Sequence, residues 1–307
     1  MVTNLTINYL ARKEIDIAKW DQCIDKAANG LIYAYSFYLD HLALQWDALI
    51  LNDYQNVMPL TWNKKYGIYY LFQPLLCAQL GIFGNNINKD LITSFLKSIP
   101  KKFRYWDISL NYANVFRIDD FNLQERNNFV LPLNKPYEEL YSNYRENSKR
   151  NINKSRQLGC YIKKDFGAEK VIQLAIEQMR NYTLTDAGDF DKFYNLYLFL
   201  HKRQHAMTYG IFSAKHELLA SCIFFFSHSR AYYILVGNHP IGKTIGASHA
   251  LIDAFIKEHS GTELVLDFEG SDIRNLAFFY SSFGATEEKY PSIKLNRLPW
   301  FGKWFKK

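Results

Sequence analysis

The chain has 307 residues, of which 48% are hydrophobic, 22% charged and 17% aromatic. These proportions exclude a disordered chain, and the length is sufficient for two ordinary domains that each bury a core. The formal net charge of +7 favours an anionic partner, such as a pyrophosphate, a nucleotide-sugar, tRNA or a membrane surface, without choosing among them. A basic protein without such a partner is the alternative.

The cysteines and the apolar runs indicate the cellular compartment of the protein. The four cysteines are far apart and form no CxxC or Cys/His ligand spacing, which favours reduced thiols and the cytoplasm. The first residues lack the basic-then-apolar pattern of a signal peptide, and no apolar run approaches the ~20 residues of a membrane helix. We therefore expect a cytoplasmic protein without a transmembrane segment.

The first half alternates helical patterns with short apolar, aromatic runs. A strand is expected at residues 5–9, and amphipathic helices at 16–28 and 36–44. Turn residues separate the next apolar runs, which predict antiparallel strands at 46–52, 56–62 and 67–72. A helix follows over 88–100, with Asn88 as its cap and Pro100 as its stop. Further strands are expected at 104–110 and 127–133.

The second half opens with a polar, basic segment at 137–159, which has helical spacing and ends on Gly159 at a helix C′ position. We place the domain boundary near residue 135, giving domains 1–135 and 136–307. The later elements are listed here in chain order: a strand at 161–165, helices at 168–181 and 190–203, three strands within 208–238, a helix at 249–259, a strand at 263–270, a helix at 275–284 and a strand at 292–298. This order predicts an α+β fold, which the first half repeats more weakly.

A glycine-bearing turn at 239–248 joins an aromatic strand to a helix. Such a turn exposes backbone N–H groups at the positive end of the helix dipole, where pyrophosphate commonly binds. The candidate donor-binding residues form one run: Lys243, Thr244, Ile245, Gly246, Ala247 and Ser248. The alternative is that Ser248 caps the helix and the glycines only make the turn.

Two of these segments resemble the GNAT acyltransferases. Their Gln/Arg-x-x-Gly-x-Gly/Ala turn binds the CoA pyrophosphate, and the segment from Lys243 to Ser248 is similar, with Lys and Ser at the two positions that differ. Because of those two differences, the resemblance predicts an anion at this turn without specifying that the anion belongs to CoA. The segment from Phe279 to Gly284 is similar to the GNAT pattern in which a tyrosine, here Tyr280, protonates a leaving thiolate. A packing role for Tyr280 is the alternative.

Three segments in the same order resemble the FemAB family over about residues 140–290: the helix at 144–159, the strand end at 266–271 and the helix end at 279–284. The resemblance implies two GNAT-like domains in tandem, each a mixed, mostly antiparallel sheet flanked by helices. Characterised members move an amino acid from aminoacyl-tRNA to the amine of a cell-wall precursor, and GNAT relatives move acyl groups from CoA or a carrier protein. The chain lacks the long coiled-coil insertion of some members.

The implied chemistry needs a proton acceptor and a donor to the oxyanion. In GNAT-like folds a backbone N–H of the splayed strand stabilises the oxyanion, and that strand is expected at 232–237. Asp267 or Glu269, at the end of the next strand, is the candidate base, although Asp267 can instead form an ion pair or hold the Gly270 turn. Substrate-binding candidates on the basic segment are Arg145, Lys149, Arg150 and Lys154, with a solvated charged face as the alternative.

The leading hypothesis is an N-acyltransferase or aminoacyl-transferase that moves a group from acyl-CoA, an acyl carrier or aminoacyl-tRNA to an amine, including one on a cell-envelope precursor. A catalytically silent module that binds an anionic glycan or lipid precursor is the alternative, and a nucleic-acid binder ranks third. We expect no DNA partner. We also expect no metal site, since His201 and His205 lack the Glu of a metalloprotease motif. The tail at 300–307 either contacts a membrane surface or packs on the protein.

Overall fold

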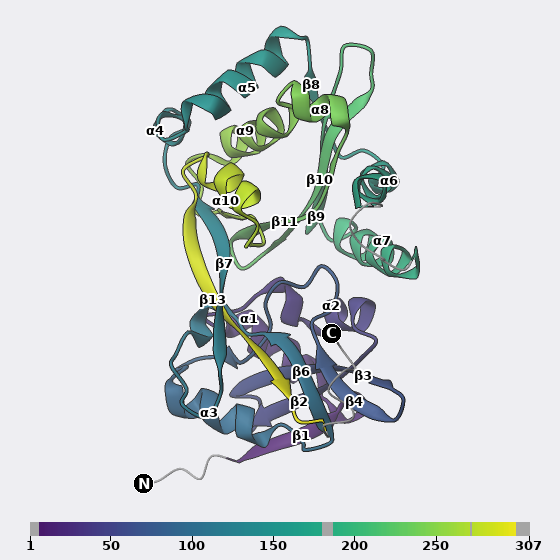
Figure 1. Ribbon diagram of the computed structural model, residues 1–307, viewed down its shortest axis with the longest axis vertical. Coiled ribbons are helices and arrows are strands. Elements are labelled where there is room, and N and C mark those ends of the chain that lie inside the picture. The colour runs from purple at the N-terminus through teal and green to yellow at the C-terminus, as the bar shows by residue number, and fades with distance from the viewer. Residues whose placement is uncertain (1–5, 180–186, 271, 299–307) are drawn as a thin grey trace. The chain divides into compact units, whose positions relative to one another are not determined.

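The protein is described by a computed structural model that covers residues 6–179, 187–270 and 272–298 (Figure 1). The chain forms two compact units: unit 1 comprises residues up to Arg126 together with those from Lys289 onward, and unit 2 comprises Asn127–Glu288. The expected domains 1–135 and 136–307 stay a prediction. The compact units differ from them in two ways: unit 2 begins at Asn127, within the strand Leu123–Pro132, and most of the last strand is grouped with unit 1.

Unit 1 is a mixed sheet with helices. Its elements are β1 (Ile7–Ala11), α1 (Ile17–Lys26), α2 (Ser36–Leu42), β2 (Gln45–Leu51), β3 (Asn56–Lys65), β4 (Ile68–Phe72), β5 (Phe83–Gly84), α3 (Lys89–Ser98) and β6 (Phe103–Ser109), with short 3₁₀ helices at Arg12–Glu14, Ile32–Ala34 and Tyr112–Asn114. The strands run in the order β1-β2-β3-β4-β6, and β13 (Thr286–Asn296) follows β6. Only β4 and β6 are parallel among these pairs, and β5 pairs with β3.

The helix expected at 88–100 is confirmed as α3, and its capping residue is the expected one. The Asn88 side chain accepts a hydrogen bond from the Leu91 N–H at 2.9 Å. This bond satisfies one of the N–H groups that the first turn leaves without an intrahelical partner. Ile92 and Phe95, one turn apart on the same face of α3, are completely buried in the core of unit 1.

Unit 2 repeats the plan of unit 1. Its elements are β7 (Leu123–Pro132), α4 (Tyr137–Ser142), α5 (Glu146–Gln157), β8 (Tyr161–Lys164), α6 (Ala168–Met179), α7 (Ala187–His201), β9 (Ala206–Phe212), β10 (Leu218–Ser227), β11 (Arg230–Asn238), α8 (Pro240–Thr244), α9 (Ala247–His259), β12 (Val265–Asp267) and α10 (Arg274–Ser281). The strand order is β8-β9-β10-β11-β12-β7, and β11 and β12 form its parallel pair. Helices α6 and α7 cover one face of this sheet, and α9 and α10 lie on the other (Figure 1).

The two units share one order: a strand, two helices, three antiparallel strands, a helix, and a strand parallel to the third of those antiparallel strands. In unit 1 the short strand β5 lies between the third strand and the helix. Each sheet is completed by a strand from elsewhere in the sequence. Strand β7 precedes most of unit 2 and pairs with β12, whereas β13, at the end of the sequence, pairs with β6 of unit 1. The expected α+β class, with two mostly antiparallel GNAT-like sheets flanked by helices, is confirmed.

The core of unit 2 is built from aromatic rings on its central strands and on α9. The rings of Phe224 on β10 and Phe255 on α9 stack with their centroids 4.0 Å apart. Tyr209 on β9 contacts both of them edge to face. Buried aromatic side chains of this size contribute a large share of the hydrophobic stabilisation, so α9 is held firmly against the sheet.

Two predicted elements were wrong in detail. Residues 137–159 form α4 and α5 instead of one helix, because the Arg145 N–H donates to the Ser282 carbonyl at 2.9 Å and Tyr144 is buried against Phe283. The turn at 239–248 contains a short helix, α8, in which Pro240 occupies the first helical position, where its missing N–H costs nothing.

Some predictions fall on residues outside the described ranges. They concern Leu5, Ser271, the end of the helix expected at 168–181, and the tail at 300–307. Within the described ranges, no helix is both long enough and apolar enough to cross a bilayer. Cytoplasmic location stays a prediction.

Candidate active site

The central strand β11 diverges from its parallel neighbour partway along its length. The register with β12 runs from Arg230 to Tyr232, whereas β11 continues to Asn238. On its other side, the register with β10 shifts between Ile223 and Phe224, which marks a β-bulge. Beyond Tyr232, the backbone groups on the β12 side of β11 therefore have no partner from β12. The splay expected at 232–237 is present at this point.

Gly246 starts α9 in a conformation that other residues rarely adopt. Its φ of +76° lies in the left-handed region, and a Cβ added there would come within 2.5 Å of the Asn151 carbonyl oxygen on α5. Glycine therefore meets two needs at once, the left-handed backbone and the close approach of α5. The N-terminus of α9 has no side-chain cap, in contrast to α3.

A cavity of about 320 Å³ opens beside this helix start. It lies within unit 2, between the splayed end of β11, the α8–α9 turn and α10. Its lining residues are Gln178, Tyr233, Val236, Asn238, Lys243, Gly246, Ser248, His249, Leu276, Phe279 and Tyr280. One hollow therefore joins the helix N-terminus at Gly246 to the phenol of Tyr280.

The predicted donor-binding residues divide into two groups. Lys243, Gly246 and Ser248 line the cavity. Thr244 and Ala247 do not: the Thr244 hydroxyl donates to the Ile241 carbonyl within its own turn at 2.8 Å, and Ala247 is buried in the core. Ile245, at the end of α8, packs against the same core. The backbone of this turn and the exposed Lys243 therefore remain the candidates for an anion site, which stays a prediction.

Tyr280 and Tyr233 present two buried phenols to the cavity. Tyr280 is 7% exposed and Tyr233 is 4% exposed. Burial raises the pKa of both groups, and the charge of Glu269 raises the pKa of Tyr280 further. Neither hydroxyl hydrogen-bonds to another residue in the described part of the chain. Both phenols therefore stay protonated at neutral pH, with donors available to a ligand.

Asp267 lies outside the cavity, in a buried ion pair. Its Oδ2 accepts a hydrogen bond from Arg230 at 2.8 Å, and its Oδ1 accepts from the Asn128 side chain at 3.0 Å and from the Glu269 N–H at 2.9 Å. Burial raises the pKa of this carboxyl, and the charge of Arg230 opposes that shift. The geometry is the ion pair and turn that the sequence left open as an alternative to catalysis.

Glu269 follows Asp267 by two residues, at a half-buried position with a φ of +66°. Its charge raises the pKa of Tyr280. Neither Asp267 nor Glu269 is among the residues that line the cavity, so the role of a base stays a prediction for both.

Three of the four predicted substrate-binding side chains on α5 and at its start contact neighbouring residues of the protein. The Lys154 Nζ donates to the Thr244 carbonyl at 2.9 Å, at the C-terminal end of α8. The Lys149 Nζ pairs with Glu146 at 3.1 Å, and the Arg145 guanidinium lies 4.5 Å above the Phe278 ring. Arg150 is exposed. None of these four predicted substrate-binding residues lines the cavity, so that role stays a prediction for all four.

His249 also lines the cavity, although the sequence analysis assigned it no role. Its ring lies edge-on to Phe279, with the centroids 4.8 Å apart, and burial lowers its pKa to about 4. The imidazole is therefore neutral at physiological pH. Its position in the first turn after the glycine turn was the available clue. Gln178 and Asn238 were also missed.

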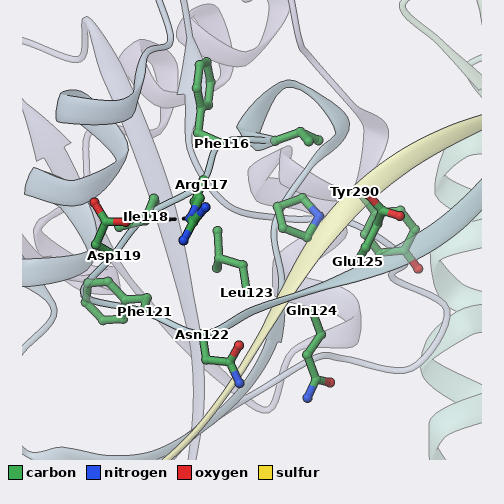
Figure 2. A pocket seen from close by; sticks show the side chains of 12 residues that line it. Phe116, Arg117, Ile118, Asp119, Phe121, Asn122, Leu123, Gln124, Glu125 and Tyr290 are labelled. Carbon is green, nitrogen blue, oxygen red and sulfur yellow. Dashed lines mark ion pairs between the residues drawn. The ribbon is translucent and has the colours of Figure 1, made fainter.

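Unit 1 has a larger hollow of a different kind. This cavity, of about 720 Å³, is lined by residues 115–119 and 121–125 with Tyr290 and Pro291 (Figure 2). Figure 2 shows Arg117 beside Asp119. The Arg117 Nε and the Asp119 Oδ1 are 3.8 Å apart. None of the predicted site residues lies there, and the N-terminus of α3 in the same unit is closed by Asn88.

The splayed parallel pair, the glycine turn and the repeated plan define a FemAB/GNAT-like fold. Comparison with solved structures agrees with this. The chain matches FemX with a TM-score of 0.64 and 13% identity, over 93% of this chain and 97% of that one. It also matches a conserved protein of unknown function from Bacteroides thetaiotaomicron VPI-5482 with a TM-score of 0.59 and 12% identity, over 95% and 100%.

A further match is L-PGS from Bacillus licheniformis, with a TM-score of 0.50 and 11% identity over 83% of this chain and 85% of that one. No protein-family model and no curated protein matches the sequence. At these identities the comparisons establish the fold, and the activity has to be argued from the cavity.

Proposed function

We propose that this protein is an N-acyltransferase or aminoacyl-transferase whose activated donor binds in the unit 2 cavity. The observation that carries the proposal is the continuity of one hollow from the uncapped N-terminus of α9 at Gly246 to the buried phenol of Tyr280, which has no hydrogen-bond partner among the described residues. The first end suits a doubly charged anion, because N–H groups, the helix dipole and Lys243 converge there. The second end suits a reacting carbonyl.

The reaction is the attack of an amine on an activated acyl carbonyl. A nitrogen–carbon bond forms and the bond from that carbon to the donor sulfur or oxygen breaks. Tyr280 donates its proton to the leaving atom, which a phenol with a raised pKa does only as the leaving anion develops. Tyr233 and the free backbone edge of β11 donate hydrogen bonds to the oxyanion. The amine proton passes to Glu269, directly or through water.

Asp267 is disfavoured as the base because both of its oxygens already accept hydrogen bonds. A proton on Asp267 would weaken a buried pair with Arg230, and breaking such a pair costs about 3–5 kcal/mol. The donor classes that fit an anion followed by a reactive carbonyl are acyl-CoA, an acyl carrier and aminoacyl-tRNA. The fold shared with FemX supports an amine acceptor on a cell-envelope precursor.

A second candidate function is a silent module that binds an anionic glycan or lipid precursor. It is favoured by the neutral His249, whose pKa of about 4 makes it a weak base, and by the internal ion pairs of α5. Such a module would bind in the same cavity without transferring a group, so the two functions share their binding test and separate on transfer.

Thermal unfolding in the presence of acetyl-CoA, CoA, a UDP-linked muropeptide or charged tRNA tests the proposal. A ligand at 100 times its Kd adds about 2.7 kcal/mol to the stability. We expect stabilisation by a ligand that bears a pyrophosphate or phosphodiester, and a reduced shift in Lys243→Glu. The matched control is Lys215→Glu, an exposed lysine between β9 and β10. If no ligand raises the melting temperature, the transferase function is wrong; stabilisation without transfer to any amine favours the silent module.

A further inference from the structure

One end of the unit 1 sheet gathers exposed cations from three separate segments of the chain. Strand β3 ends there at Lys65, and a two-residue turn leads into β4. Strand β6 begins at the same end, because β4 and β6 are parallel. Strand β13 also ends there, since the Arg297 N–H donates to the Arg104 carbonyl at 2.8 Å. We call this surface the basic end of unit 1 and define it by residues 62–69, 101–105 and 295–298.

The basic end contains no Asp or Glu in any of its three segments. Most of its exposed cations form no ion pair within the described ranges; these are Lys64, Lys65, Lys101, Arg104 and Arg297. In contrast, the Lys102 Nζ lies 3.8 Å from the Asp47 Oδ2, and the exposed Lys89 elsewhere in unit 1 pairs with Asp119 at 3.1 Å. Like charges without counter-charges repel one another and attract an anionic partner.

An exposed tyrosine forms the tip of this surface. Tyr66 and Gly67 have φ values of +49° and +80°, as a two-residue hairpin turn of the favoured twist requires. Asn, Asp and Gly are the usual residues at the first of these positions, because a bulky side chain is strained there. Tyr66 is 83% exposed, so packing offsets little of that strain. Contact with a partner therefore explains the ring better than folding does.

Apolar and aromatic groups lie among the cations. The Lys64 Nζ lies 4.9 Å from the centre of the Tyr69 ring, and the Lys65 Nζ lies 5.5 Å from that of Tyr66. Leu44, which is 50% exposed, lies at the same end, just before the start of β2. Exposed rings and aliphatic side chains among lysines are typical of surfaces that enter the headgroup region of a bilayer.

The composition favours a lipid surface over RNA. Lysines supply the charge beside the hairpin tip, whereas recognition of nucleic acid commonly uses the bidentate geometry of arginine. Beyond Leu298 and outside the described ranges, the sequence continues in the same way: residues 299–307 include Trp300, Phe301, Trp304 and Phe305 together with lysines, and no Asp or Glu. Aromatic residues interspersed with lysines are characteristic of segments at a membrane–water interface.

We propose that the basic end of unit 1 docks on an anionic lipid bilayer, with the Tyr66 ring in the headgroup region and Lys64, Lys65 and Lys101 against lipid phosphates. Each cation near an anionic leaflet strengthens partitioning by about fivefold, so the docking is electrostatic and reversible. The surface lies wholly in unit 1 and shares no residue with the unit 2 cavity. It therefore does not rest on the proposed function.

Flotation of the full-length protein with lipid vesicles tests the docking. We expect partitioning onto vesicles of phosphatidylcholine and phosphatidylglycerol at about 3:1, weakened by added salt, and none onto phosphatidylcholine alone. The double variant Lys65→Glu/Lys101→Glu should lower the partition coefficient at least about twentyfold, because two cations are lost and two anions are added.

The matched control is Lys26→Glu/Lys202→Glu, which makes the same change of charge elsewhere. Lys26 ends α1 near the opposite end of β3, beside Gly84, and Lys202 is an exposed residue that follows α7 in unit 2. We expect its partition coefficient to change by less than about twofold, because salt screens charges that lie beyond a Debye length from the leaflet.

Two further measurements examine the hairpin tip. Tyr66→Ser leaves every charge in place and should lower the partition coefficient at least about threefold, because the ring no longer enters the headgroup region. In the wild-type protein, the backbone amides of residues 64–67 should exchange hydrogen more slowly when the mixed vesicles are added. This measurement serves even if a variant fails to fold, and unchanged exchange overturns the docking.

The remaining outcomes identify a different contact. Partitioning that survives Lys65→Glu/Lys101→Glu and Tyr66→Ser but is lost in Trp300→Ser/Trp304→Ser overturns the proposal and assigns the contact to residues 299–307. Binding of tRNA that is lost in Lys65→Glu/Lys101→Glu, with no partitioning onto the mixed vesicles, overturns it in favour of RNA. A wild-type protein that does not partition onto the mixed vesicles at low salt also overturns it. Group transfer in the unit 2 cavity is measured without vesicles, so it stands or fails separately.

Discussion

Among single residues, Tyr280 combines features that usually exclude each other. A buried hydroxyl normally finds a hydrogen-bond partner, since leaving it without one costs about 1–3 kcal/mol. The rings of Phe268 and Tyr280 stack with their centroids 4.6 Å apart, which fixes the phenol in place. A fixed donor that has no partner in the described part of the chain and lies on a cavity wall fits the proposed role of donating to a group of the ligand.

Tyr280→Phe is expected to lower kcat by about 10²-fold and to leave the KM for the donor nearly unchanged, because the ring still packs while the proton donor is lost. Steady-state kinetics with the donor found by thermal shift measures both constants. The control is Tyr66→Phe, since Tyr66 is 83% exposed in a turn of unit 1. An unchanged kcat in Tyr280→Phe would make Tyr280 a packing residue.

His249 predicts a specific dependence of stability on pH. Burial lowers its pKa from 6.5 to about 4, so the folded protein holds this ring neutral where the unfolded chain protonates it. Between pH 6.5 and pH 4 the unfolded state binds more protons, and stability falls as the pH falls; above pH 6.5 the contribution of His249 is fully present. The loss across this window is on the order of 2 kcal/mol after allowance for partial exposure.

The measurement is urea unfolding at pH 7 and pH 4.5 for wild-type protein and for His249→Gln. The variant should lose less stability than the wild type between these two values, because its side chain does not titrate. His259, also with a lowered pKa, is unchanged in both proteins and cancels in the comparison. Equal losses in the two proteins would contradict the assigned pKa of His249.

For the elements, the approach of α5 to α9 depends on the missing side chain at Gly246. Two glycines of unit 2 share a φ of +76°, Gly246 and Gly261, but only Gly246 has atoms within 4 Å of its ideal Cβ position. Comparing the same substitution at these two glycines separates the strain of a left-handed backbone from the packing of α5 against α9. Gly246 also links helix packing to the anion site, because the same residue begins α9.

Gly261→Ala should cost about 1 kcal/mol of stability, the strain of placing a Cβ in the left-handed region. Gly246→Ala should cost about 1–3 kcal/mol more, since its Cβ would displace the Asn151 backbone. Chemical denaturation of both variants measures the difference. Equal costs would show that α5 shifts freely away from α9.

The elements also show where local sequence patterns were sufficient. Asn88 and Gly159 marked helix ends correctly, because capping depends on residues close in the sequence. The break between α4 and α5 could not be found this way, since it depends on Ser282, more than a hundred residues away. In the site, Gly246 and Tyr280 follow from local motifs. Gln178 was missed because its partner Asn238 lies 60 residues further along the chain.

On the scale of the whole molecule, the repeated plan of the two units raises the question of how many donor sites the chain has. The order of elements within each half was predictable, because hydrophobic periodicity is local. The partners of the closing strands were not, because no local pattern states that β13 pairs with β6 and β7 with β12. The repeated order of elements therefore does not by itself predict whether each unit binds a donor.

The number of donor sites depends on the start of the helix that follows the third antiparallel strand in each unit. In unit 2, α9 starts at a left-handed glycine without a side-chain cap, beside a cavity. In unit 1, the Asn88 side chain occupies the equivalent position on α3 and bonds the Leu91 N–H that an anion would need. We therefore expect one donor molecule per chain, although the plan occurs twice.

Isothermal titration with CoA, or with whichever donor raises the melting temperature, measures this stoichiometry directly. A value of one that disappears in Lys243→Glu and persists in Asn88→Ala assigns the site to unit 2. Asn88→Ala should also lower stability by about 1 kcal/mol through the lost cap, which confirms that the cap existed. A stoichiometry of two, with the second site removed by a substitution in unit 1, would show that a capped helix start can still bind the donor.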